Sequence, residues 1–170
     1  MKKLVVLSGV PGSGKSYFSE LIKKSTTGHV YIISSDNLRK LIAGHQQNLD
    51  FDPLMWKIFY QLPKAYSLDE NAIVILDSTN TLSKYRVDAT SELKQYFDEV
   101  DLVVFKIDRD ILEKQNLERE FPIPIEALTY YYDNFEMPNE KDEAFFDNIY
   151  IIESSDFHKT VYKIISNNEK

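Results

Sequence analysis

The chain has 170 residues, with 27 acidic and 20 basic side chains, a net charge of −7 and no cysteine. This length favours one domain, 1–170, with its own core. The absence of cysteine excludes a disulfide partner and thiolate metal sites, and it favours a cytoplasmic location. No apolar run approaches the roughly 18 residues of a membrane span, so no membrane association is expected.

Short apolar runs alternate with helical patterns along the chain. The runs lie at residues 4–7, 30–33, 73–76, 102–105 and 149–152. Apolar residues recur at helical spacing at 18–22, 54–62 (Leu54, Ile58, Leu62), 87–97, 111–117 and 161–165. Strand–helix alternation predicts an α/β fold with a five-stranded, mostly parallel sheet flanked by helices. Right-handed crossovers would bring every strand's carboxyl end, and any ligand site, to one edge of that sheet.

Residues 9–16 match G-x-x-x-x-G-K-[ST] in full, between the first predicted strand and the first predicted helix. Such a loop cradles a polyphosphate with its amides, helped by the positive end of the helix. Lys15 would reach the β- and γ-phosphates, and Ser16 would bind Mg²⁺. Tyr17 stands where a dinucleotide fingerprint needs its third glycine, which excludes NAD. The predicted nucleotide-binding residues are Gly9, Pro11, Gly12, Ser13, Gly14, Lys15, Ser16 and Tyr17.

Two acidic residues follow predicted strands at the ligand edge. Asp36 follows the second strand, and Arg39 lies one helical turn further on. Asp36 is suited to accept a proton from an attacking hydroxyl, and equally to cap a helix that begins at Asn37. Asp77 follows the third strand and would orient Mg²⁺ directly or through water; alternatively it only ends the strand in a turn. The motifs of guanine-nucleotide switches, N-K-x-D and D-x-x-G after the third strand, are absent.

Several other residues allow more than one interpretation. The basic residues of 83–86 either contact phosphate or lie on a solvated helix face. Trp56 anchors the third helix in the core or forms a wall of an acceptor groove. Tyr130, Tyr131 and Tyr132 either stack on bases or are ordinary core and surface aromatics. At most one or two of them can line a groove, because consecutive helical residues point in different directions. The acidic segment 136–147 is expected to be a solvated loop.

Together these motifs resemble the phage-type 5′-hydroxyl polynucleotide kinases, and the wider group of small P-loop kinases that contains them, over residues 1–152. The resemblance implies a P-loop kinase core with a helical lid at about 109–135. It also implies transfer of the γ-phosphoryl of ATP, with Mg²⁺, to the 5′-hydroxyl of DNA or RNA. Asp36 would be the general base, Arg39 would hold the acceptor's phosphate, and Arg119 would clamp the donor phosphates.

Two alternatives remain open. Gln115 stands where these kinases often have a lid arginine, which would weaken the donor clamp or shift it to Arg109. The substitution favours a nucleotide-binding module without turnover. The acidic net charge instead favours a kinase of small molecules or nucleotides, with the same machinery and a smaller acceptor pocket.

Overall fold

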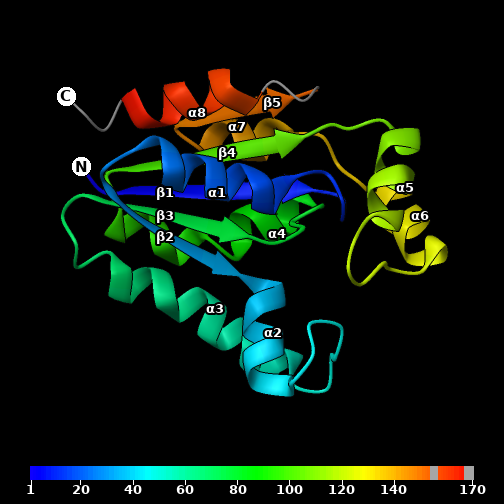
Figure 1. The fold of residues 1–170 in the computed structure, drawn as a ribbon. Coiled ribbons are helices and arrows are strands. Elements are labelled where there is room, and N and C mark those ends of the chain that lie inside the picture. The colour runs from blue at the N-terminus through cyan, green and yellow to red at the C-terminus, as the bar shows by residue number, and fades with distance from the viewer. Residues whose placement is uncertain (154–156, 167–170) are drawn as a thin grey trace.

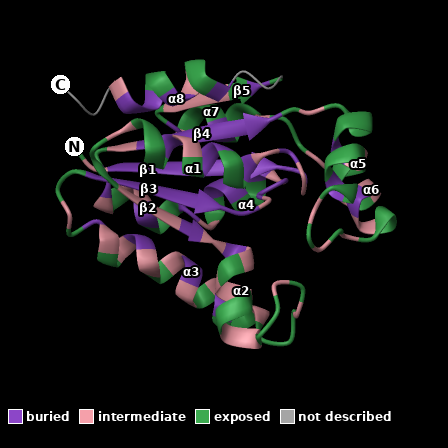
Figure 2. Ribbon diagram, in the orientation of Figure 1, coloured by how far each residue is buried: buried purple, intermediate pink, exposed green. Residues whose placement is uncertain are grey.

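A computed structural model describes residues 1–153 and 157–166, and its centre is one five-stranded sheet (Figure 1). The strands are β1 (Lys3–Gly9), β2 (His29–Ser34), β3 (Ala72–Asp77), β4 (Glu99–Phe105) and β5 (Asn148–Ile152). Their order is β2-β3-β1-β4-β5, and each neighbouring pair is parallel. Every residue of β1 and of β3 is buried, as the unbroken apolar runs predict (Figure 2). The predicted α/β fold is confirmed.

Helices cover both faces of this sheet. They are α1 (Lys15–Ser25), α2 (Ser35–Ala43), α3 (Asp52–Tyr66), α4 (Ser83–Asp88), the 3₁₀ helix η1 (Ser91–Tyr96), α5 (Arg109–Leu117), α6 (Ile125–Asp133), α7 (Glu140–Phe145) and α8 (Phe157–Ser166). Side chains of α1 and α8 pack on one face, and side chains of α3, α4 and η1 pack on the other. The α5–α6 pair stands beyond the carboxyl edge (Figure 1). Among the helices of 1–153 and 157–166, none has the length and apolarity to cross a bilayer.

Two helical predictions need correction. The pattern at 87–97 is not one helix, because α4 ends at Asp88 and η1 begins at Ser91. The Thr90 hydroxyl donates to the carbonyl of Arg86 and so competes with the helical backbone. On α3, the buried face holds Met55, Phe59 and Pro63, one position further along than the predicted one, and Leu54 is half exposed.

The predicted interpretations of Arg86 and of segment 136–147 are both wrong. Arg86 is fully buried, and its Nε and Nη2 donate to the two oxygens of Asp142, at 2.8 and 3.0 Å. Asp142 lies on α7, a helix that starts with a capping box at Asn139 inside the expected loop. Arg86 Nη1 also donates to the carbonyl of Glu136 at 2.7 Å and to Ser8 Oγ at 3.3 Å. The pair therefore joins α4 and α7 to the end of β1.

We expect Arg86→Met to lower the free energy of unfolding by about 3–5 kcal/mol, because it leaves the Asp142 carboxylate buried without its partner. Urea unfolding followed by far-UV circular dichroism measures the loss. Replacing both residues, Arg86→Met with Asp142→Leu, should cost less than the single change. A single variant as stable as the wild type would contradict this assignment.

Candidate active site

A cleft of about 1730 Å³ opens at the carboxyl edge of the sheet, under the α5–α6 pair. All but one of the predicted site residues line it: Pro11, Gly12, Ser13, Gly14, Lys15, Ser16, Tyr17, Asp36, Arg39, Asp77 and Arg119. Gly9 lies behind the loop, where its amide donates to the carbonyl of Thr79 at 2.8 Å. The topology thus brings the sequence motifs to one place, as the parallel sheet requires.

The loop between β1 and α1 is shaped by its glycines and by Lys15. Gly12 and Gly14 have φ values of 86° and 93°, a left-handed conformation that side chains disfavour. Lys15 Nζ turns back over the loop and donates to the carbonyls of Gly9 and Val10, at 2.9 and 3.1 Å. Burial lowers the Lys15 pKa to about 8, although the Asp77 and Asp36 charges oppose that shift. The ammonium is thus held where it can exchange these carbonyls for a phosphate.

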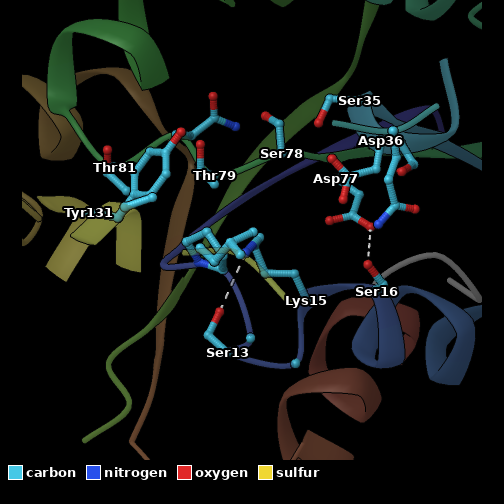
Figure 3. A pocket seen from close by; sticks show the side chains of 18 of the residues that line it. Ser13, Lys15, Ser16, Ser35, Asp36, Asp77, Ser78, Thr79, Thr81 and Tyr131 are labelled. Carbon is cyan, nitrogen blue, oxygen red and sulfur yellow. Dashed lines mark hydrogen bonds between the residues drawn. The ribbon is translucent and has the colours of Figure 1, made fainter. Parts of the chain in front are cut away.

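Ser16 and Asp77 form a hydroxyl–carboxylate pair beside the phosphate loop. Ser16 Oγ donates to Asp77 Oδ2 at 2.7 Å, so Asp77 does more than end its strand (Figure 3). Burial raises the Asp77 pKa, and the Lys15 charge and the Ser16 hydrogen bond oppose this. No group of three His, Cys, Asp or Glu in the described residues suits a metal. Mg²⁺ commonly takes one or two protein oxygens and completes its shell with phosphate and water, so this pair fits it.

The capping interpretation of Asp36 is wrong, because Ser34 caps α2. Ser34 Oγ accepts from the amide of Asn37 at 3.3 Å, and Asp36 lies inside the first turn. The Asp36 carboxylate is therefore available to the cleft, with 48% of its side chain exposed. It accepts from Arg39 Nη1 at 3.3 Å and pairs with Arg119 Nη2 at 3.7 Å.

Arg39 is held by a residue that the sequence analysis missed. Asp52, in the first turn of α3, accepts from Arg39 Nε at 2.7 Å and from Nη2 at 3.2 Å. The guanidinium also lies over the ring of Trp56, 5.4 Å from its centroid. Trp56 packs against the core, as the first of its two interpretations predicts, and its side chain also lines the cleft. The i, i+4 spacing of Asp52 and Trp56 was visible, but their approach to α2 depends on the irregular segment 44–51.

The α5–α6 pair supplies one arginine to the cleft. Arg119 follows α5 and lines the cleft, as does Gln115. Arg109 instead donates to Glu113 at 2.7 Å and to Thr129 at 2.9 Å, which ties α5 to α6. Arg109 is thus engaged between the two helices, and it is not among the residues that line the cleft.

Tyr17 and Phe157 form an aromatic surface at one end of the cleft. Their ring centroids are 5.8 Å apart, and Tyr17 is 60% exposed. Both rings line the cleft next to the start of α1. This position suits the base of a nucleotide whose phosphates lie on the loop.

A parallel five-stranded sheet, with a phosphate loop after its central strand and a hydroxyl–carboxylate pair beside that loop, gives the chain the P-loop kinase fold. Comparison with sequence families identifies the particular group. The chain belongs to the AAA_33 family, described as an AAA domain, which matches residues 4–138.

Similar proteins include kinases of different acceptors. An L-seryl-tRNA(Sec) kinase of Methanococcus maripaludis is 27% identical over 98% of this chain, which spans 66% of that relative, just under two thirds of its length. A fungal RNA kinase has a TM-score of 0.68 and 15% identity, covering 98% of this chain and 43% of the other. The APS kinase of Mycobacterium tuberculosis, solved with AMPPNP and APS, has a TM-score of 0.67 and 17% identity, with coverage of 99% and 98%. These two structures establish the shared fold.

We expect ATP binding to weaken as the pH rises through 8. The free protein's Lys15 is an ammonium below its pKa of about 8 and is neutral above it, and bound phosphate favours the charged form. The dissociation constant for ATP, measured by calorimetry, should rise about tenfold between pH 7 and pH 9. The Lys15→Ala variant should bind weakly with little pH dependence. A flat profile in the wild-type protein would refute the assignment.

Proposed function

We propose that the protein is an ATP- and Mg²⁺-dependent kinase that phosphorylates the 5′-hydroxyl end of a nucleic acid, with Asp36 as general base. One observation carries the proposal. Ser34, and not Asp36, caps α2. The Asp36 carboxylate lies in the same cleft as the phosphate loop, in contact with Arg39 and Arg119. A general base in this position can take the proton of an acceptor hydroxyl that enters the cleft from the side opposite the phosphate loop.

The donor side of the cleft would hold the triphosphate by its charge. The loop amides and Lys15 would bind the β- and γ-phosphates, and Ser16 and Asp77 would hold Mg²⁺. When bound, the ion neutralises charge that develops on the phosphates. Arg119 would leave Asp36 and turn to the donor phosphates, supplying positive charge as the γ-phosphoryl departs.

On the acceptor side, Asp36 would take the proton of the attacking hydroxyl. The hydroxyl oxygen forms a bond to the γ-phosphorus, the bond to the β-phosphate oxygen breaks, and ADP leaves. Arg39 presents to Asp52 the edge formed by Nε and Nη2. The edge formed by Nη1 and Nη2 is then the one directed at an acceptor phosphate, once Nη1 exchanges Asp36 for that phosphate.

The name of one relative favours a nucleic acid as the acceptor. The cleft of about 1730 Å³ has room for an acceptor beside a nucleotide, since a single small ligand occupies roughly 300–1,000 Å³. The curated relative is, by its name, a kinase of L-seryl-tRNA. That relative also favours a second candidate function, phosphorylation of a seryl hydroxyl carried on tRNA, because its 27% identity extends over 98% of this chain.

An acceptor panel tests the proposal. Labelled γ-phosphate of ATP is offered, with Mg²⁺, to 5′-hydroxyl RNA, 5′-hydroxyl DNA, seryl-tRNA, and small alcohols and nucleosides. We expect transfer to a 5′-hydroxyl strand. Transfer to seryl-tRNA alone would establish the second candidate, and transfer only to small acceptors would overturn both.

Asp36→Asn should reduce the rate of transfer by about 10²–10⁴-fold, because the amide cannot accept the hydroxyl proton. ATP affinity should stay within a few-fold of the wild type, since Asp36 is not part of the phosphate loop. Single-turnover rates and calorimetry measure the two quantities. Wild-type rates in this variant would remove Asp36 from the role of base.

Asp52→Asn should raise the KM for the acceptor by roughly tenfold, because it removes a charge-assisted hydrogen bond that orients Arg39. The KM for ATP should not change. Asp52→Glu keeps the charge and should restore part of the acceptor affinity. If Asp52→Asn only lowers the melting temperature, Asp52 has a structural role and does not position Arg39 for the acceptor.

A further inference from the structure

The cleft continues past the reactive centre into an uncharged lobe between α4 and α6. Its lining comes from residues 78–89 and 123–134, and within these segments no lining side chain is charged. The part near α2 and α3 is different, because Lys15, Asp36, Arg39 and Asp52 all line it. Beyond Asp77, therefore, the cleft changes from a charged surface to a neutral one.

Three tyrosines line this lobe, and together they are called the tyrosine wall: Tyr85 from α4, and Tyr130 and Tyr131 from α6. Tyr85 is 50% exposed and Tyr130 is 65% exposed. The rings of Tyr130 and Tyr131 lie 5.9 Å apart at 71°, so each limits the movement of the other. Figure 3 shows Tyr131 beside Thr81, on the opposite side of the cleft from Asp36.

Glu136 connects the two sides of the lobe through hydrogen bonds. The amide of Glu136, just past α6, donates to the carbonyl of Thr81 at 2.9 Å. Its carboxylate accepts from the amide of Ser83 at 2.9 Å, and its carbonyl accepts from the buried Arg86. The lobe between α4 and α6 is therefore built into the fold and does not depend on one loop conformation.

The side chains that line the lobe determine which kind of ligand it can bind. A phosphate would need cations, and none of the lobe's lining side chains is one. Aromatic rings with neutral hydrogen-bonding groups beside them bind nucleobases by stacking, which tolerates any base. We propose that the tyrosine wall binds a nucleobase of the acceptor strand. The proposal rests on the function proposed above, because it assigns a subsite to the same acceptor.

The test measures binding separately from catalysis. A short 5′-hydroxyl oligonucleotide with a 3′ dye is titrated with the protein and a non-hydrolysable ATP analogue, and fluorescence anisotropy is recorded. A second strand has the same sugar–phosphate backbone with abasic sites in place of its bases. The variants are Tyr85→Leu and Tyr130→Leu, whose exposed side chains make unfolding no concern. Tyr162→Leu is the matched control, because Tyr162 is an exposed tyrosine on α8 that does not line the cleft.

We expect the wild type to bind the base-bearing strand more tightly than the abasic strand. Tyr130→Leu should weaken binding of the base-bearing strand by about 5- to 100-fold and leave the abasic strand unaffected, with a smaller effect for Tyr85→Leu. Tyr162→Leu should change neither. The proposal is overturned if the tyrosine variants weaken both strands equally or neither, or if the wild type binds neither strand.

Phosphate transfer to the same two strands separates this proposal from the proposed function. If base-selective binding depends on Tyr130 but no transfer to the 5′-hydroxyl occurs, the function fails and the subsite stands. If transfer occurs at equal efficiency on both strands, the function stands and the subsite fails.

Discussion

The site depends on the way β1 is fastened to the segment that follows β3. Three hydrogen bonds make this junction: Gly9 amide to Thr79 carbonyl, Asn80 Nδ2 to Leu7 carbonyl, and Ser8 Oγ to Asn80 carbonyl, at 2.8, 2.9 and 2.8 Å. Asn80 has a φ of 43°, a left-handed conformation that asparagine accepts better than most residues. Because the strands are parallel, this junction places the phosphate loop beside Asp77. The contact between Ser16 and Asp77 is one of its consequences.

The cations of the cleft are neutralised within the protein, which explains how an acidic chain can hold a phosphate site. Arg39 is paired with Asp52 and Asp36, Arg119 is paired with Asp36, and Lys15 experiences the charges of Asp77 and Asp36. A phosphate that bound in the cleft would replace a carboxylate partner of an arginine, or the carbonyl partners of Lys15, and would create no new buried cation. The cost of desolvating the arginines has then largely been met during folding.

Sequence patterns predict those parts of the fold that burial and backbone chemistry fix locally. The five strands are recognisable because each contains a short unbroken apolar run, and β1 and β3 are buried along their whole length. The loop at 9–16 is recognisable because its glycines and Lys15 have fixed spacing. The partners of Arg86 and Arg39 could not be predicted, since Asp142 and Asp52 lie 56 and 13 residues away and no pattern links them. Helix α7 was not predicted because its sequence is short and mostly charged, and the buried residue Asp142 cannot be told apart from its exposed acidic neighbours by sequence. At the break between α4 and η1, the Thr90 hydroxyl donates to the carbonyl of Arg86, a contact that the apolar pattern of 87–97 does not reveal.

The distribution of charge along the cleft bears on the choice of acceptor. Two groups of aromatic rings line the cleft, Tyr17 with Phe157 beside the start of α1 and the tyrosine wall between α4 and α6, together with charged residues of the phosphate loop, α2 and α3. Two nucleosides joined through phosphates would match this lining, with one base for each aromatic group and the phosphates for the charged residues. A small polar acceptor would satisfy the charged centre but leave the neutral lobe filled with water, at no gain in binding. The uncharged, aromatic lining of the lobe therefore favours an acceptor that carries a base of its own.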